Sequence, residues 1–120
     1  MNLNPSAKAQ KASKLEANIV EITTFQLVEG TTDEAFLTAT EQMQKDFLDK
    51  QAGFIRRQLA KGENGWVDIV FWESKAALET AMQHAESSEA AAPFIELIDF
   101  QSVQIQMNVC DLMFSANKSQ

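Results

Sequence analysis

The fold of this chain is decided by residues 53–74, which read G-F-I-R-R-Q-L-A-K-G-E-N-G-W-V-D-I-V-F-W-E-S. Two runs rich in β-branched and aromatic residues flank the turn residues Gly62-Glu63-Asn64-Gly65, a composition typical of a β-hairpin. Ser74 then follows the second run and is suited to cap a helix. The stretch therefore predicts a strand, a tight turn, a second strand and the beginning of a helix.

Before this hairpin the sequence predicts one strand and one helix. Residues 18–28 are rich in Ile, Val, Thr and Phe, which favours a strand. Gly30 interrupts this run, and Thr31 with Glu34 has the spacing of a capping box. Apolar residues at helical spacing follow, from Phe36 to Leu48, so we expect a helix that ends before Gly53.

After the hairpin the sequence predicts a second helix and a last strand. The second helix has its apolar stripe at Ala77, Leu78, Ala81, Met82 and Ala85. A short helical piece begins at Pro93, a residue tolerated in the first turn of a helix. Polar and apolar residues then alternate over 102–109, which is the pattern of a half-buried strand.

The predicted order is strand, helix, strand, strand, helix, strand, which is the order of a ferredoxin-like α+β sandwich. In that architecture the strands lie in the order fourth, first, third, second, with both helices on one face. We expect a flexible or helical N-terminal arm over 1–17, the folded domain over 18–112 and a C-terminal tail over 113–120.

Charge and composition exclude several classes of function. The net charge is -7, and from residue 18 onward 16 acids face 7 bases, which gives -9. Such a surface repels phosphate backbones, so we expect no nucleic-acid partner. No apolar run is long enough to cross a bilayer, the start of the chain lacks the apolar stretch of a signal peptide, and Cys110 is the single cysteine. These features predict a cytoplasmic protein without a membrane partner.

The second face of the predicted sheet needs a cover. We expect Val67, Ile69 and Phe71 to face the helices, because this set contains no group that needs a hydrogen-bond partner. The alternate set then lies on the open face together with residues of the other strands: Trp66, Asp68, Val70, Trp72, Ile19, Glu21, Thr23, Phe25, Leu27, Phe54, Arg56, Gln58, Ser102, Gln104 and Gln106. Two tryptophans there would form an apolar patch, which predicts a homodimer that closes a dimeric α/β barrel.

A few residues carry chemistry that this fold could use. Asp68 stands in an apolar strand, and a buried carboxylate needs a partner, for which Arg56 and Arg57 are the candidates. The alternative is a catalytic role for Asp68. The same two readings, an ion pair or catalysis, apply to Glu21. His84 is the single histidine, and the choice lies between a base and a surface residue of the second helix. Trp66 and Trp72 are either packing residues or walls of a ligand site.

Metal and nucleotide sites are not indicated. One histidine and one cysteine cannot fill a metal site without several carboxylates. The four glycines form neither a dinucleotide fingerprint nor a phosphate loop. We therefore expect no cofactor.

The hairpin, the helix around Phe36 and Leu37, the Gly53-Phe54 pair and the closing segment 98–103 together resemble the dimeric α/β-barrel superfamily, and within it antibiotic biosynthesis monooxygenase-like proteins. The resemblance covers roughly residues 18 to 110. Members include oxygenases that need neither metal nor flavin and act on phenolic or quinol-like substrates. Haem-degrading relatives carry an Asn on the first strand where this chain has Thr23 and Thr24, so we do not expect haem degradation.

The resemblance implies a cofactor-independent monooxygenase acting on a small aromatic or quinol-like substrate. In this hypothesis His84 or Asp68 accepts a proton, while Trp72, Trp66, Arg56 and Glu21 bind the substrate. One alternative is a non-enzymatic, stress-related or ligand-binding dimeric barrel. Another is a lactone isomerase or similar acid/base enzyme that uses Asp68, Glu21 or His84 without oxygen. The sequence leaves these alternatives open.

Overall fold

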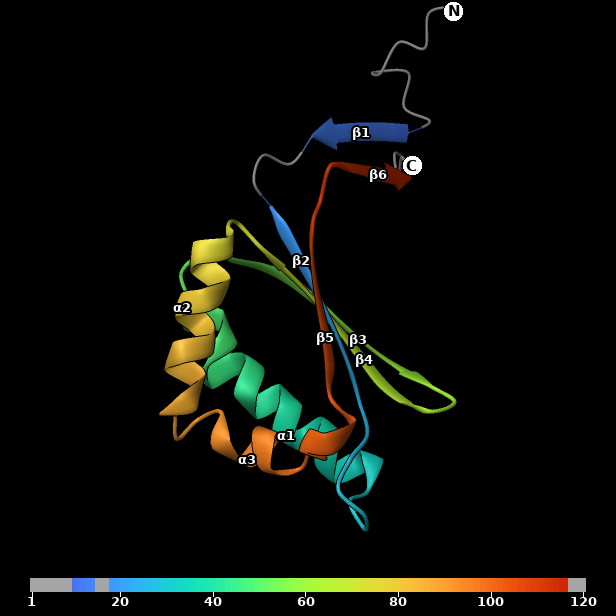
Figure 1. Cartoon of the computed structure of the whole chain (residues 1–120), viewed down its shortest axis with the longest axis vertical. Helices are drawn as coiled ribbons and strands as arrows, with labels where there is room; N and C mark the ends of the chain where they lie inside the picture. The colour runs from blue at the N-terminus through green and yellow to red at the C-terminus, as the bar shows by residue number, and fades with distance from the viewer. Residues whose placement is uncertain (1–9, 15–17, 117–120) are drawn as a thin grey trace, which may run out of the picture.

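A four-stranded antiparallel sheet with helices on one face forms the body of the protein (Figure 1). The structure, a computed structural model, describes residues 10–14 and 18–116. The strands are β2 (Ile19–Phe25), β3 (Phe54–Gly62), β4 (Gly65–Trp72) and β5 (Gln104–Val109), and they lie in the order β3-β4-β2-β5. This is the predicted order, and the ferredoxin-like α+β fold is confirmed.

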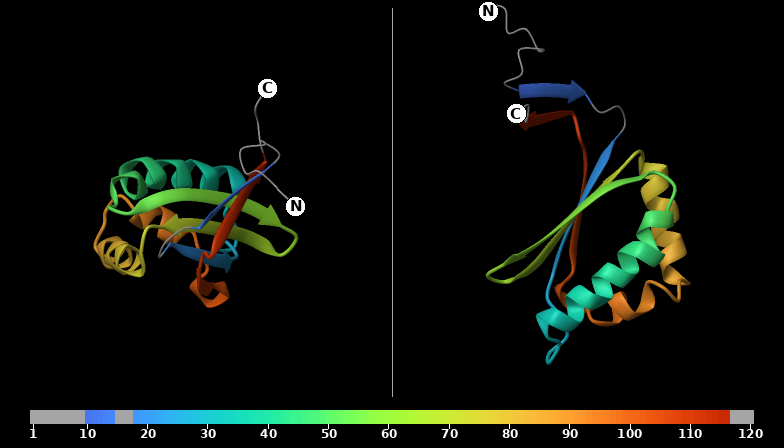
Figure 2. Two further views of the ribbon diagram at one scale, coloured as in Figure 1. Left: turned by 90° about the horizontal axis from the view of Figure 1, so that it is seen from above. Right: turned by 180° about the vertical axis from the view of Figure 1, so that it is seen from behind.

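Three α-helices cover one face of the sheet (Figures 1 and 2). They are α1 (Asp33–Asp46), α2 (Lys75–Glu86) and the short α3 (Ala92–Glu96), with 3₁₀ turns η2 (Leu48–Lys50) and η3 (Phe100–Ser102) between elements. Ser74 caps α2 as predicted, since its hydroxyl accepts the Ala77 N–H. The predicted capping box is wrong by one residue, because Thr32, not Thr31, accepts the Ala35 N–H at the start of α1.

The prediction of which face meets the helices is wrong. The buried residues of β4 are Trp66, Asp68, Val70 and Trp72, whereas Val67, Ile69 and Phe71 stay partly exposed. The β2 residues that pair with the buried set share its face, so Ile19, Glu21, Thr23 and Phe25 also point toward the helices. The open face instead carries Val20, Ile22, Val67, Ile69 and Phe71, with Gln104 and Gln106 there as expected.

A β-bulge in β3 accompanies this reversal and supplies the partner that the buried Asp68 needs. The ladder between β3 and β4 shifts its register between Phe54 and Arg56. The shift turns Arg57 toward the helices, where it pairs with Asp68, and leaves Arg56 on the open face. A buried carboxylate with a bonded partner is tolerated, so the mixed set can be buried.

A second, two-stranded sheet lies beyond the end of the body (Figures 1 and 2). It pairs β1 (Gln10–Lys14) with β6 (Leu112–Ala116), two segments far apart in the sequence. We call this pair the β1–β6 ribbon. It differs from the expected flexible or helical arm over 1–17 and from the expected tail over 113–120, because each segment satisfies backbone groups of the other. The rest of the arm lies outside the described residues.

Candidate active site

A cavity of about 160 Å³ lies between the sheet and the helices. Its walls come from β2, β4, α1, α2 and α3 and are mostly apolar. The lining residues are Glu21, Met43, Phe47, Leu48, Asp68, Val70, Trp72, Leu78, Ala81, Met82, Ala85, Ala91, Phe94 and Ile95. An apolar pocket with a few convergent polar groups is the typical form of a small-molecule site.

Glu21 is the carboxylate most suited to proton transfer in this cavity. Its Oε1 accepts a 3.0 Å hydrogen bond from the Trp72 indole Nε1. Burial raises the pKa of Glu21 above its usual value, and the negative charge of Asp68 raises it further. The Trp72 hydrogen bond and the Arg57 charge lower that pKa in part. Burial thus makes the Glu21 carboxylate a stronger proton acceptor than an exposed glutamate, and a positioned carboxylate of this kind can act as a general base.

Asp68 is held in an ion pair at the edge of the same cavity. Arg57 donates to both of its oxygens, with Nε–Oδ1 and Nη2–Oδ2 distances of 2.8 and 2.7 Å. Both side chains are nearly buried, at 7% exposure for Arg57 and 12% for Asp68. The guanidinium also donates to Gln44 Oε1 at 3.3 Å and lies over the Phe94 ring. This geometry fits the structural partnership that the sequence left open for Asp68.

Trp72, the last residue of β4, is fixed by packing against the neighbouring strand β3. It is 2% exposed, and its ring meets Phe54 edge-on at 5.9 Å between centroids. The end of the hairpin also holds this region, because Gly53, with φ +86°, accepts the Glu73 N–H through its carbonyl. The indole N–H is thereby directed at Glu21 rather than at solvent.

The other sequence-predicted site residues lie outside this cavity. His84 is exposed on α2, and its Nδ1 lies 2.9 Å from Gln51 Oε1. Arg56 is exposed over the Phe71 ring on the open face, 4.8 Å from its centroid. Trp66 is buried at the hairpin end of the sheet against Phe36. The structure therefore brings Glu21, Asp68 and Trp72 together and separates them from His84, Arg56 and Trp66.

Sequence reasoning missed the apolar wall opposite the sheet. Met43 and Phe47 from α1 and Phe94 and Ile95 from α3 close the cavity. Met43 and Phe47 stand four residues apart on the predicted apolar face of the first helix, so their contact with the sheet could have been inferred. The position of α3 could not, because it depends on how the loop after α2 folds back.

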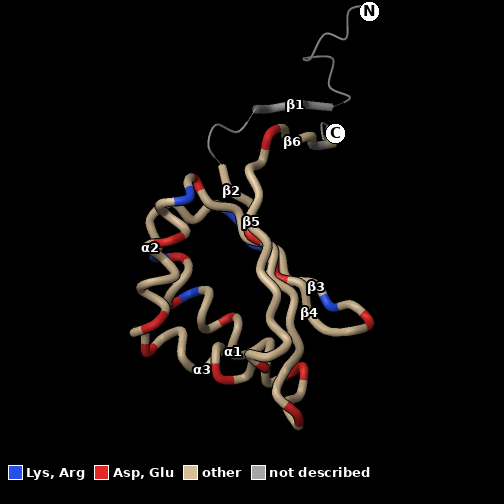
Figure 3. Tube along the Cα trace, in the orientation of Figure 1, with Lys and Arg blue, Asp and Glu red and all other residues tan. Residues whose placement is uncertain are grey.

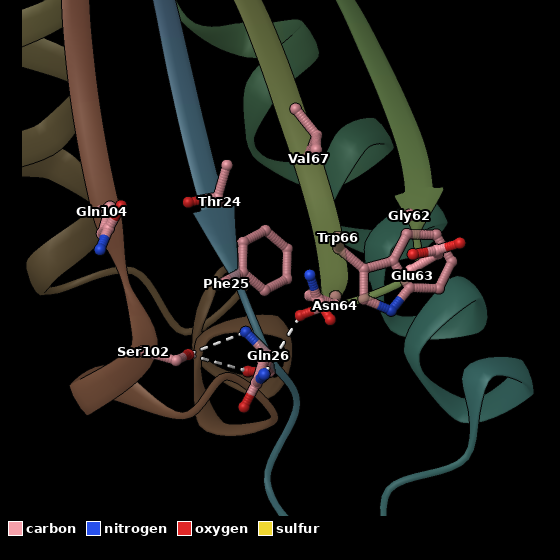
Figure 4. Close-up of a pocket in the computed structure, with 11 residues that line it drawn as sticks. Thr24, Phe25, Gln26, Gly62, Glu63, Asn64, Trp66, Val67, Ser102 and Gln104 are labelled. Atoms are coloured by element: carbon pink, nitrogen blue, oxygen red, sulfur yellow. Dashed lines mark hydrogen bonds between the residues drawn. The ribbon is translucent and has the colours of Figure 1, made fainter.

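A broader hollow of about 520 Å³ lies at the hairpin end of the sheet (Figure 4). Gln26 ties it together, since its Nε2 donates to the Asn64 carbonyl at 3.1 Å and its N–H donates to Ser102 Oγ at 2.8 Å. Its only charged lining residue is Glu63 in the exposed turn. The inner cavity instead contains Glu21, whose pKa is raised by burial, so the inner cavity is the stronger candidate for chemistry.

Among the described residues, no group of three or more His, Cys, Asp or Glu side chains is placed to hold a metal ion. The helices of the described part of the chain are all too short or too polar to cross a membrane.

Several solved structures share this fold. SnoaB from Streptomyces nogalater, a cofactor-independent oxygenase, superposes with a TM-score of 0.64 at 15% identity, over 78% of this chain and 93% of its own. A protein from Shewanella oneidensis gives 0.58 at 19% identity, over 88% and 100% of the two chains. A dimeric protein with a ferredoxin-like fold from Bacteroides fragilis gives 0.58 at 12% identity, over 80% and 99%. At these identities the likeness shows the fold alone.

Comparison with curated proteins finds no match. The family model for antibiotic biosynthesis monooxygenases, in contrast, matches residues 18–93. That range contains the hairpin, both long helices and the carboxylate, tryptophan and ion pair of the cavity. Because the match covers more than half of the chain, the protein belongs to the antibiotic biosynthesis monooxygenase family.

Proposed function

We propose that this protein is a cofactor-independent monooxygenase that oxidises a small phenol or quinol-like compound in the cavity between sheet and helices. The observation that carries the proposal is the Glu21 carboxylate, held by Trp72 inside an apolar pocket. Membership of the family and the fold shared with a cofactor-independent oxygenase support it.

The size of the cavity limits the substrate class. A dry apolar cavity of about 150 Å³ accommodates one benzene ring. At about 160 Å³, this cavity suits a substrate with a single aromatic ring buried in it. Phe47, Phe94 and Met43 provide the apolar contacts, and Glu21 is the acceptor for a phenolic hydroxyl.

The reaction needs a base, a dry site and dioxygen as co-substrate. Glu21 takes the phenolic proton, and the resulting phenolate is electron-rich enough to transfer an electron to dioxygen. A carbon–oxygen bond then forms at a ring carbon that carries a hydrogen, ortho or para to the phenolate oxygen. Loss of the hydrogen on that carbon with cleavage of the O–O bond leaves a quinone and water. One phenol and one dioxygen thus give one quinone and one water, with both substrate hydrogens in the water.

Trp72 and the Asp68–Arg57 pair influence the reaction by orienting the Glu21 carboxylate and shifting its pKa. Trp72 orients the carboxylate, and its indole N–H stabilises the charged form. The Asp68–Arg57 pair sets the field beside it. We assign the proton acceptor to Glu21 rather than to Asp68 or His84, because Arg57 occupies both Asp68 oxygens and His84 lies on the outer surface of α2.

We also propose that the protein is a cytoplasmic homodimer. The open face carries Val20, Ile22, Val67, Ile69 and Phe71, all only partly buried in the single chain. A face with this many apolar side chains calls for a partner, and a second copy pairs the same surface with itself. A Bacteroides fragilis protein of the same fold is dimeric, which supports this assembly.

An oxygen electrode with a panel of monocyclic hydroquinones and phenols tests the proposed activity. We expect oxygen uptake that falls by about 10²–10⁴-fold in Glu21→Gln, the range for loss of a general base. Glu86→Gln, an exposed acid on α2, is the matched control and keeps full activity. Binding of a phenol without oxygen uptake would reject the monooxygenase and favour the ligand-binding alternative.

A further inference from the structure

Half of the exposed large apolar side chains in the described part of the chain lie on β5 and β6. Ile105, Met107 and Val109 on β5 are 47%, 46% and 68% exposed, and Leu112 and Phe114 on β6 are 50% and 60% exposed. The β5 side chains lie on the face of the sheet that looks toward the helices, in register with Thr23, Glu21 and Ile19. The helices cover β2 and β4 but leave this edge strand bare (Figure 2).

The β1–β6 ribbon needs a surface to pack on. Its two strands pair with each other and not with the four-stranded sheet. A two-stranded ribbon alone is only marginally stable in water. Only Cys110 and Asp111 separate β5 from β6, and the Cys110 N–H bonds to the Asn18 carbonyl where the ribbon leaves the body. The ribbon therefore projects away from its own β5 and leaves the helix-side face of that strand uncovered (Figure 1).

Charge favours a second copy as that chain. The segment before Asn18 has three lysines and one acid, a net charge of +2, whereas the remainder of the chain has -9. Neither β5 nor β6 contains a charged residue (Figure 3). A ribbon continuous with a basic segment is attracted to the acidic body of another copy, and no like charges oppose the contact on β5.

We propose that the β1–β6 ribbon of one copy lies over the helix-side face of β5 in a second copy. The exchange is reciprocal under two-fold symmetry. Each copy's ribbon covers the β5 face of the other copy, so both ribbons and both β5 faces are buried at once. This inference rests on the homodimer proposed above and adds a contact outside residues 18–93, the range that the family model matches.

The exchange also completes the candidate active site. Met107 pairs in register with Glu21, so the bare β5 face is the flank of the strand that carries the proton acceptor. Phe114 or Leu112 from the partner copy would exclude water from that flank. Exclusion of water strengthens the electrostatic interactions of Glu21 and protects a reactive phenolate from side reactions.

A mixed-disulfide experiment tests the ribbon contact. In a Cys110→Ser background, Met107→Cys protein is mixed with Phe114→Cys protein and oxidised. We expect a disulfide-linked dimer that contains one chain of each variant, identified by intact mass. Phe100→Cys mixed with Phe114→Cys is the control and gives no such product, because Phe100, 74% exposed, lies on η3 before the start of β5, at the opposite end of that strand from β6.

Solution mass separates this inference from the homodimer itself. A wild-type mass of two chains without the 107–114 mixed disulfide overturns the ribbon contact and leaves the homodimer. A wild-type mass of one chain overturns both.

Discussion

The Trp72 indole nitrogen donates a 3.0 Å hydrogen bond to Glu21 across the β2–β4 ladder, 51 residues apart in the sequence. This contact joins a carboxylate of raised pKa to a residue that is 2% exposed. The hydrogen bond holds the carboxylate on the cavity wall that β2 and β4 form. Aromatic side chains from the α1 and α3 regions line the opposite wall.

Trp72→Phe removes this hydrogen bond while keeping an aromatic ring against Phe54. Since the bond lowers the pKa of Glu21, its loss raises that pKa further. We expect the midpoint of the rise of kcat/KM with pH to move to higher pH in phenol oxidation. Trp66→Phe, at the other end of β4, is the control and leaves the midpoint in place. An unchanged midpoint in Trp72→Phe would separate this indole from the proton acceptor.

The stability of the protein should depend on pH through Glu21. Its pKa is raised on folding, so the folded state binds more protons than the unfolded state above about pH 4.3, the usual glutamate value. The stability contributed by the protonated group is present below that pH and is lost as pH rises through the folded-state pKa. We expect urea unfolding to show Glu21→Gln gaining stability relative to wild type as pH rises from 4 to 8.

A flat difference between Glu21→Gln and wild type across this range would contradict the raised pKa. The exposed-surface variant Glu86→Gln serves as the reference for general charge effects, because it removes the same charge from α2 without touching the cavity.

Arg57→Ala leaves the Asp68 carboxylate nearly buried without its partner. Removing one member of a buried ion pair destabilises proteins by about 3–5 kcal/mol. We expect a loss of this order in the free energy of unfolding, measured with urea. Arg56→Ala, one residue away but exposed on the other face, should change it by less than about 1 kcal/mol.

Replacing both partners tests whether the loss in Arg57→Ala comes from the unpaired Asp68 charge. Arg57→Met with Asp68→Leu removes both charges, so we expect it to recover most of the stability lost in Arg57→Ala. Failure to recover it would mean that the pair contributes more than the avoidance of an unpaired charge.

Gly53→Ala disturbs the junction between the hairpin and α2. Gly53 has φ +86°, and a Cβ there would come 2.5 Å from the Ala77 Cβ. Gly30 has a similar φ of +90° with nothing within 4 Å, so Gly30→Ala isolates the backbone strain, about 1–2 kcal/mol. We expect Gly53→Ala to lose ~1–3 kcal/mol more than Gly30→Ala in thermal or urea unfolding, as in other overpacked sites. Equal losses would show that Ala77 moves aside freely.

The sequence by itself determined the order of the four main strands and the two long helices, the topology of the four-stranded sheet and the N-cap of the second helix. These follow from local signals: turn residues at 62–65, strand alternation after Ser102, and Ser74 before an apolar helical stripe. It also marked Glu21, Asp68 and Trp72 as residues of interest, and these three share the cavity.

Only the tertiary structure decided which face of the sheet these residues occupy. A period of two assigns residues to two sets but does not say which set is buried, and the bulge between Phe54 and Arg56 is invisible in the pattern. That bulge directs Arg57 to Asp68, and the resulting ion pair permits burial of the mixed set. His84 lies outside the cavity because its position depends on how α2 packs, which local sequence does not encode. Trp66 lies at the opposite end of β4 from Trp72, a separation that the length of the strand sets by itself.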